Sequence, residues 1–486
     1  MLMRALAFAV LFAAVPGFAA ADNVVTYHNS PTRHGDYTIP GLTLATAASM
    51  HPDAGFHGSV PGHVYAQPLF WHPEGGRSLV VVATESNVVV ALDAATGATV
   101  WQTKLGAPVP LGSLSCGNID PDGITGTPVI DARSGVVYLD ALTGTNAGPR
   151  HLVTALSLAN GAVVSHWPLD IQGELAKRGV NFSSSVQGAR SALQLVGGAL
   201  YVSYGGRYGD CGEYRGTVIQ LQSSPPKLVA SWQTRAKGGG IWAQGGTASD
   251  GDSLFATTGN TFDAQDWSDG EAIVRLRSGL VHSAGNADYF TPSNWKTLDD
   301  DDADLGGTEA LPFDVGAAKR VIAFGKDGNA YLVDRANLGG IGGALAVTKE
   351  SDNAIITAPA IYETPDAAMV AFTNRGGKCG RTNITMLRVS AAGKVPVTTA
   401  WCAAFRGRGA PIVTTSDGSS NPIVWVVGAE GDNLLHGFNA VNGHAVFSGG
   451  STPMTGLHHF ETILAAEGRL YVAADERIYA FAFAPP

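Results

Sequence analysis

A recurring two-part segment constrains the fold of this chain more than any other feature. Residues 80–105 read VVVATESNVVVALDAATGATVWQTKL, which is two strands of alternating residues, a Thr-Gly turn and a third strand. Residues 151–169 and 434–450 repeat the second half of the pattern, each with Asn-Gly at the turn. Alternation with period two, followed by a glycine-bearing turn, is typical of β-hairpins.

A shorter marker, proline or a small residue followed by apolar residues, precedes these hairpins. It occurs in eight copies, around Pro68, Pro128, Ala192, Gly246, Leu311, Pro359, Pro411 and Ile463. Repeats of this length are typical of propeller blades with long loops. We therefore predict an all-β fold, an eight-bladed β-propeller of four-stranded blades. The alternatives are a seven-bladed ring and a pair of β-sandwiches.

The two ends of the chain are predicted to close the ring. The last unit, 456–486, has room for about three strands, and the segment 40–62 is expected to supply the missing one. Closure of this kind leaves no free sheet edge. The predicted organisation is a signal peptide over 1–21 and a single β-propeller domain over 22–486.

The N-terminus has the pattern of an export signal. Arg4 precedes an apolar run over 5–15, and the small residues at 19–21 offer a cleavage site before Asp22. A short anchoring or buried helix is the alternative. The rest of the sequence has no run of 18 apolar residues, so we expect no membrane span and a periplasmic or secreted protein.

Charge and cysteines limit the function classes. A formal charge of −10 argues against nucleic acid and anionic membranes as partners. Export permits disulfides. Of the three possible pairings of four cysteines, we favour Cys379–Cys402, within one strand-rich unit, and Cys116–Cys211. There is no C-x-x-C-H motif for covalent haem attachment.

The repeat ALDAATGATVWQT closely resembles that of pyrroloquinoline quinone (PQQ) propellers. The segments YHNSPTRHG (27–35), CGNIDPDGITGTPVID (116–131), GGIWAQGG (239–246) and AYLVDRANLGG (330–340) extend the resemblance over nearly the whole mature chain. They resemble a large group of exported bacterial PQQ-repeat proteins, which is similar to quinoprotein alcohol dehydrogenases. That resemblance implies a propeller fold and a cofactor site in its central funnel.

In quinoprotein alcohol dehydrogenases a Trp stacks on one face of PQQ and a vicinal disulfide covers the other. A Ca²⁺ or lanthanide ion, bound by a Glu, an Asn and sometimes an Asp, acts as a Lewis acid on the reactive carbonyl. An Asp takes the alcohol proton, a Lys or Arg reaches the quinone oxygens, and the cofactor accepts the hydride equivalent.

Five residues of this chain match that site in order. Trp242 matches the stacking Trp, and Asn260, eighteen positions later, matches the metal-binding Asn. Asp302 matches the base, Asp304 the extra ligand of lanthanide-type enzymes, and Lys326 the cation beside the quinone.

Each match has a simpler interpretation. Trp242 is also explained by packing between blades, Asn260 by a turn cap and Lys326 by a hairpin turn. The acidic run 299–302 is equally typical of a solvated loop or a surface Ca²⁺ site, and the base lies within one or two positions of Asp302.

Three departures separate this chain from the family pattern. Ser115-Cys116 stands where the vicinal disulfide would be, and Asp120-Pro121-Asp122 where an Arg is expected. The metal-binding Glu is displaced: Glu213 is the nearest acid, and Asp210 is the other candidate ligand.

His458 and His459 form a further candidate for a transition-metal site. Adjacent residues of a strand point to opposite faces, so the pair by itself favours a surface or loop role.

Two functions follow. The first is a periplasmic quinoprotein-like oxidoreductase that uses PQQ and Ca²⁺ or a lanthanide to oxidise an alcohol and passes electrons to a separate carrier. The second is a non-catalytic propeller that binds cell-envelope proteins through its loops.

Overall fold

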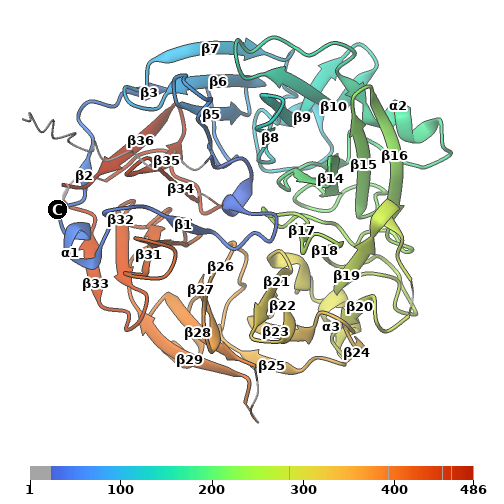
Figure 1. Ribbon diagram of the computed structural model, residues 1–486. Helices are drawn as coiled ribbons and strands as arrows, with labels where there is room; N and C mark the ends of the chain where they lie inside the picture. Colours follow the sequence, from blue (N-terminus) through green and yellow to red (C-terminus); the bar gives the residue numbers. More distant parts are fainter. Residues whose placement is uncertain are drawn as a thin grey trace, which may run out of the picture.

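Eight antiparallel sheets are arranged as blades around a common centre (Figure 1), which confirms the predicted eight-bladed propeller. This computed structural model describes residues 23–283, 285–391, 393, 395–450, 453–460 and 462–484. The expected signal segment 1–21 lies outside the described residues. Among the described helices, none is long and apolar enough to cross a membrane.

The first four blades follow one another along the chain. The first blade contains β4 (Leu69–Trp71), β5 (Leu79–Thr84), β6 (Val88–Asp93) and β7 (Thr99–Lys104), and the second contains β8 (Val129–Asp131), β9 (Val136–Thr145), β10 (Gly148–Ser157) and β11 (Leu169–Asp170). The third blade contains β12 (Gln187–Gly188), β13 (Gln194–Val196), β14 (Ala199–Gly206), β15 (Thr217–Ser223) and β16 (Pro226–Gln233). The fourth contains β17 (Ala248–Ser249), β18 (Ser253–Thr258), β19 (Ala272–Arg277) and β20 (Tyr289–Thr291), with β24 (Gly340–Ile341) beside β20. The last strand of a blade lies at the rim, as β7 and β16 show (Figure 1).

The other four blades complete the ring. Their strands are β21 (Leu311–Val315), β22 (Ala318–Phe324), β23 (Asn329–Asp334) and β25 (Ala346–Lys349); β26 (Ala360–Thr364), β27 (Ala367–Thr373), β28 (Ile384–Ser390) and β29 (Val397–Ala403); β30 (Ile412–Thr415), β31 (Ile423–Val427), β32 (Leu435–Asn439) and β33 (Ala445–Ser448); β34 (Ile463–Ala466), β35 (Arg469–Ala474) and β36 (Arg477–Ala482). The described helices are short: α1 (Leu44–Ala47), α2 (Ile171–Ala176), α3 (Trp295–Asp300) and five 3₁₀ turns, η1 (Tyr27–Asn29), η2 (Leu111–Ser113), η3 (Ser278–Leu280), η4 (Leu305–Gly307) and η5 (Gly377–Cys379).

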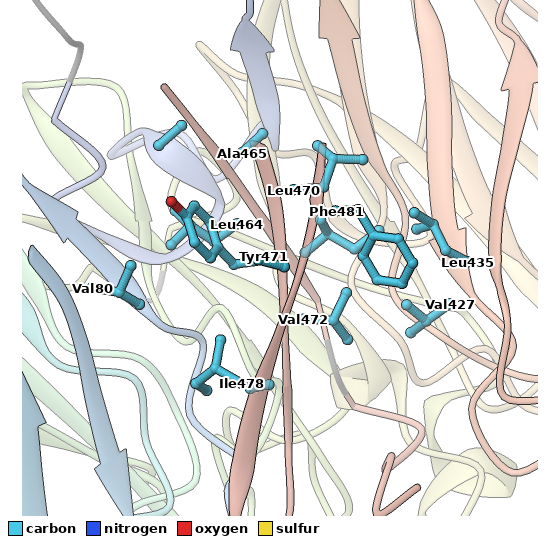
Figure 2. Packing of buried hydrophobic residues seen from close by; sticks show 14 of the residues in the cluster. Val80, Val427, Leu435, Leu464, Ala465, Leu470, Tyr471, Val472, Ile478 and Phe481 are labelled. Atoms are coloured by element: carbon cyan, nitrogen blue, oxygen red, sulfur yellow. The ribbon is translucent and has the colours of Figure 1, made fainter. Parts of the chain in front are cut away.

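The hydrophobic core lies between neighbouring blades rather than at one centre. Every residue of β5 is buried, whereas β7 at the rim is mostly exposed and buries only Trp101. Figure 2 shows one such layer, in which Tyr471 and Ile478 of the last blade face Val80 of the first. Both faces of a middle strand are therefore covered, which explains its uninterrupted apolar sequence.

The repeated Trp and Gly residues join one blade to the next. The indole N–H of Trp101 donates to the carbonyl of Leu158 at 2.8 Å, and a Cβ at Gly161 would lie 2.5 Å from the Trp101 ring. Trp401 and Gly443 repeat this arrangement five blades along. Both glycines have a positive φ of 72–74°, so glycine is favoured there by conformation and by space.

The N-terminal segment closes the last blade, as predicted. The short strands β2 (His51–Pro52) and β3 (Gly58–Ser59) both pair antiparallel with β36. His51 lies opposite Ala482 and Gly58 opposite Ile478. The last blade therefore receives its outer strand from the other end of the chain, which joins the ring without a free edge.

The segment that precedes this closure crosses the centre of the ring (Figure 1). Its strand β1 (Asp36–Thr38) pairs in parallel with β30. Residues 24–35 form hydrogen bonds with all eight blades. In each blade the partner lies in the first strand or directly beside it: Phe70, Ile130, Leu193, Thr247, Pro312, Ile361, Val413 and Thr462. Arg33 is fully buried in this position. The sequence pattern did not predict this central crossing.

Both favoured disulfides are present. Cys116–Cys211 joins two loops 95 residues apart, and Cys379–Cys402 lies within the sixth blade.

Candidate active site

A cavity of about 610 Å³ opens among the loops that connect the strands. Its volume falls in the range of small-molecule and cofactor sites. Six of the seven site residues predicted from the sequence line it: Asp210, Trp242, Asn260, Asp302, Asp304 and Lys326.

Asp304 is the centre of the polar contacts on one wall. Its Oδ1 accepts a hydrogen bond from the backbone N–H of Asn260 at 2.8 Å. Its Oδ2 accepts one from the Trp242 indole at 3.1 Å and lies 2.7 Å from Nζ of Lys326. The residue is only 3% exposed, so its charge is balanced mainly by these three donors.

The chain around Asp304 is held by backbone contacts. Asp304 directly precedes η4, whose first N–H, from Leu305, donates to Oε2 of the buried Glu271 at 2.6 Å. The Asp304 carbonyl accepts from the N–H of Lys326 at 2.8 Å. A Cβ at Gly259 would lie 2.8 Å from Oδ1 of Asp304, so only glycine allows this close approach.

Lys326 connects two acids and the indole. It lies in the turn between β22 and β23, as its hairpin pattern predicted, and its side chain lines the cavity. Its Nζ lies 2.7 Å from Oδ1 of Asp302 and 5.3 Å from the centre of the Trp242 ring. Burial opposes the charge, but Asp304 and Asp302 outweigh burial and raise the pKa of Lys326.

Asn260 follows β18 and offers its side chain to the cavity. Its backbone is fixed on both sides, since the carbonyl also accepts from the N–H of Gly239 at 2.6 Å. Among the described residues, its side-chain amide has no hydrogen-bond partner. An amide oxygen on a fixed backbone is a suitable ligand for a hard cation.

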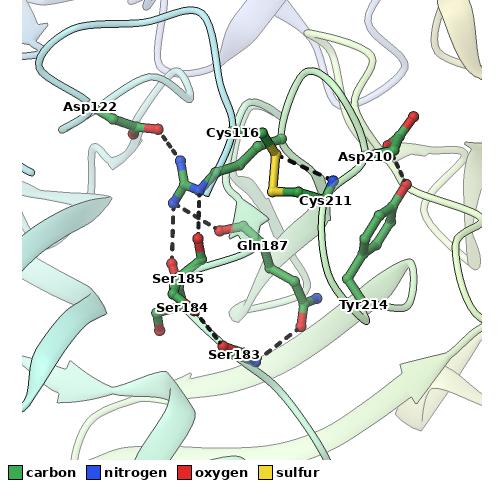
Figure 3. Close-up of a disulfide and its surroundings, with 10 residues drawn as sticks. Cys116, Asp122, Ser183, Ser184, Ser185, Gln187, Asp210, Cys211 and Tyr214 are labelled. Atoms are coloured by element: carbon green, nitrogen blue, oxygen red, sulfur yellow. Dashed lines mark hydrogen bonds and ion pairs between the residues drawn. A yellow bond between two sulfur atoms is a disulfide. The ribbon is translucent and has the colours of Figure 1, made fainter. Parts of the chain in front are cut away.

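Asp210 lies on the loop 206–214, on a different wall. It accepts a hydrogen bond from the Tyr214 hydroxyl at 2.6 Å (Figure 3). The neighbouring Cys211 is bonded to Cys116, which ties this loop to the one that carries Asn118. Burial raises the pKa of Asp210, the Tyr214 hydrogen bond opposes this shift, and the charges of Asp304 and Asp302 add to it.

Glu213 is the predicted ligand that the structure does not bring to the cavity. Its side chain is three-quarters exposed and forms an ion pair with Lys237. The loop turns between Asp210 and Glu213 so that Tyr214 and Asp210 face inward together. Of the two acids left open by the sequence, only Asp210 lines the site.

Sequence reasoning missed the basic and aromatic wall of this cavity. It contains Arg190, Arg207 and Arg408 together with Tyr208, His459 and Phe460. Arg207 pairs with Asp122, Arg408 pairs with Glu430 at 3.1 Å, and the Arg190 guanidinium lies 5.8 Å from the Phe460 ring. The arginines come from separate units with no shared motif. The Arg that the family pattern places near residue 120 is thus absent, while cations from other loops face the same space.

The two walls differ in charge. Near the acidic wall, burial and then the charge of Asp304 raise the pKa of Glu271, and burial also raises that of Asp210. Asp302 and Asp304 together carry more negative charge than the single ammonium group of Lys326 that they share. A bound cation would relieve this excess, so the chemistry of Asp210, Asn260 and Asp304 fits a hard metal ion. The Trp242 ring and the arginines fit a flat, anionic cofactor.

No known protein-family profile and no curated protein sequence matches the chain. Solved structures do. A quinohemoprotein alcohol dehydrogenase from Comamonas testosteroni superposes with a TM-score of 0.66 at 14% identity, over 94% of this chain and 80% of its own. A europium-containing methanol dehydrogenase gives 0.64 at 13%, over 93% and 89%. BamB from Moraxella catarrhalis gives 0.50 at 14%, over 89% and 98%.

These likenesses, at identities this low, define the fold. The chain is an eight-bladed β-propeller of the type found in quinoprotein alcohol dehydrogenases. This agrees with the PQQ-repeat propeller that the sequence predicts.

Proposed function

We propose that this protein is a quinone-dependent oxidoreductase of the cell envelope that oxidises an alcohol. The observation that carries the proposal is the convergence of Trp242, Asn260 and Lys326 on the carboxylate of Asp304, within a cavity of cofactor size. Structural packing alone does not require a buried acid, a cation and an unpartnered amide on one cavity wall.

The residues have separate roles in this proposal. Trp242 supplies the flat surface for PQQ, and Arg190 and Arg408 supply charge for its carboxylates. Asn260, Asp304 and Asp210 supply the oxygen ligands for Ca²⁺ or a lanthanide. A bound quinone would supply the two-electron acceptor that oxidation of an alcohol requires, and the cation would supply Lewis-acid chemistry.

Asp302 is the proposed proton acceptor for the alcohol hydroxyl. Its side chain is 63% exposed at the cavity, and its Oδ1 is held by Nζ of Lys326 at 2.7 Å. This contact positions the carboxylate, since Lys326 is itself fixed by Asp304. Tyr214 in the same way orients Asp210. Electrons then leave to a separate carrier.

The test is calorimetric titration of the purified protein with PQQ in the presence of Ca²⁺ or La³⁺. Metal-dependent binding that is lost in Trp242→Ala and Asn260→Ala, but kept in Trp267→Ala, supports the proposal. Trp267 is a suitable control because it stacks on Tyr289 and does not line the cavity. Binding that is absent in the wild type contradicts it.

A non-catalytic propeller that binds cell-envelope proteins is the second candidate. The position of Glu213, outside the cavity, favours it, as does the absence of a vicinal disulfide at Cys116. Failure to bind PQQ under either metal would favour this function.

A further inference from the structure

Three potential metal ligands meet beside the last blade, away from Trp242. Nδ1 of His63 lies 2.9 Å from Oδ2 of Asp475, and Nε2 of His458 lies 2.8 Å from Oδ1 of the same residue. All three ligand atoms lie within 4.8 Å of one another. Tetrahedral zinc with bonds near 2.0–2.1 Å requires ligand atoms about 3.3 Å apart, so the widest of these separations would have to shorten by at most about 1.5 Å.

The three ligands come from separate segments that are held together by backbone hydrogen bonds. Asp475 and Glu476 form the turn between β35 and β36. The N–H of Glu476 donates to the carbonyl of Gly62 at 2.9 Å, and the N–H of Asp475 donates to that of Gly456 at 3.0 Å. Each contact lies one or two residues from a histidine ligand, so the site is preorganised.

Glycine conformation contributes to this arrangement. Gly62 and Gly456 have φ values of 85° and 77°, a region that side chains disfavour. A Cβ at Gly456 would lie 2.8 Å from Cβ of Asp475. The close approach of the loop that carries His458 to the carboxylate therefore depends on glycine.

Two of the ligand atoms already contact each other, since Nε2 of His458 is hydrogen-bonded to Oδ1 of Asp475, and a metal ion would replace this contact. Within the described part of the chain, the buried Nδ1 of His63 has no hydrogen-bond partner, although it lies near Asp475. The Tyr65 ring stacks on His458 with centroids 4.3 Å apart and fixes the plane of the imidazole. The backbone N–H of Val64 donates to Oδ1 of Asp475 at 3.3 Å, which orients the carboxylate.

We propose that His63, His458 and Asp475 bind one divalent first-row transition-metal ion, with Zn²⁺ as the reference ion. Two imidazoles and a carboxylate suit such ions, whereas Ca²⁺ and lanthanides take oxygen ligands only. The site is thus distinct from the oxygen-donor wall at Asp304, and it does not depend on the proposed oxidoreductase function.

Three protein ligands leave a fourth position for water or an external ligand. His458 lines a cavity of about 170 Å³, which shares Arg190, His459 and Phe460 with the larger cavity. The cavity that His458 lines therefore has a guanidinium on its wall. An anionic oxygen ligand, such as a carboxylate, fits both the ion and Arg190.

The test uses the purified protein, free of a histidine tag and treated with chelator, titrated with Zn²⁺ by calorimetry and with Co²⁺ by visible absorption. One ion per chain is expected, with the intense visible Co²⁺ bands of a four-coordinate site. His63→Gln and Asp475→Asn should each weaken Zn²⁺ binding at least about 10-fold.

His459→Gln is the matched control, because its ring pairs with Glu430 instead and should leave Zn²⁺ affinity unchanged. Circular dichroism of the metal-free variants establishes that each is folded, and Zn²⁺ should raise the melting temperature of the wild type and of His459→Gln only. Absence of one-site binding in the wild type would overturn the proposal. Equal affinities in folded wild type, His63→Gln and Asp475→Asn would also overturn it.

Discussion

The indole N–H of Trp242 donates to Oδ2 of Asp304 at 3.1 Å across a sequence separation of 62 residues. This hydrogen bond fixes the plane of the Trp242 ring relative to Asp304, a cavity acid that is only 3% exposed. A change at either residue should therefore alter both the flat surface and the charge of the site.

Asp304→Asn should weaken PQQ binding in the presence of La³⁺ at least about 10-fold. The amide removes the charge that pairs with Lys326, and its NH2 group would face one of the donors from which the carboxylate now accepts a hydrogen bond. Unfolding by urea should show a loss of about 1–3 kcal/mol, less than for a fully buried pair, since Lys326 keeps Asp302.

The matched control for Asp304→Asn is Asp300→Asn. Asp300 belongs to the same acidic run but is exposed and pairs only with Lys296. It should change neither measurement, because exposed pairs contribute little. Equal effects of the two substitutions would show that the acidic run acts through its overall charge rather than through Asp304.

Lys326→Met should raise the affinity of the acidic wall for Tb³⁺ about 10-fold, because the ammonium group lies 2.7 Å from both Asp302 and Asp304 and repels a second cation. Luminescence of Tb³⁺ sensitised by Trp242 measures this directly. Lys296→Met, at an exposed lysine, serves as the control. An unchanged or lower Tb³⁺ affinity in Lys326→Met would place the cation away from these carboxylates.

The repeat predicted the blades because each one is built from local signals. The Asn-Gly turn at Gly161 and the Trp at position 101 are visible in the sequence, and together they make a contact between blades. The central crossing of residues 24–35 could not be predicted in this way. It is held to the eight blades by hydrogen bonds from its backbone and from the side chains of His28, Arg33 and His34, and such contacts leave no periodicity.

The sequence predicted those site residues that match the family pattern in their order along the chain. Trp242 lies between two blades, whereas Asn260 and Lys326 lie in loops between the second and third strands of their blades. The ring brings these loops to one cavity. The choice between Asp210 and Glu213 depended instead on how one loop turns, which the distant Cys116 and the adjacent Tyr214 decide. The basic wall was missed because its arginines come from separate loops without a common spacing.

Replacing both members of Cys116–Cys211 by Ser should destabilise the protein by about 4–5 kcal/mol, more than the same change at Cys379–Cys402, at about 3 kcal/mol. The reason is loop length: the first bridge closes 95 residues and the second 23. Urea unfolding measures both values. The first pair should also weaken cation binding, since it anchors the loop of Asp210, whereas the second should not. Loss of binding in both variants would indicate a general loosening.

Stability should fall as pH rises from about 4.5 to about 7 because of Glu309. This carboxyl is fully buried, and burial raises its pKa to about 7, against a partial opposing effect of Arg33. The folded protein thus keeps a proton that the unfolded chain releases near pH 4.5. Unfolding therefore becomes easier through this window, and the loss of stability is complete above pH 7.

A pKa shift of this size corresponds to roughly 3 kcal/mol of stability. Glu309→Gln should therefore gain little over the wild type at pH 4.5 and on the order of 3 kcal/mol at pH 8, as measured by urea unfolding. Glu85, whose pKa burial raises to about 8, should preserve a residual slope of the same sign in this variant. A gain that is equal at both pH values would mean that Glu309 does not hold its proton in the folded state.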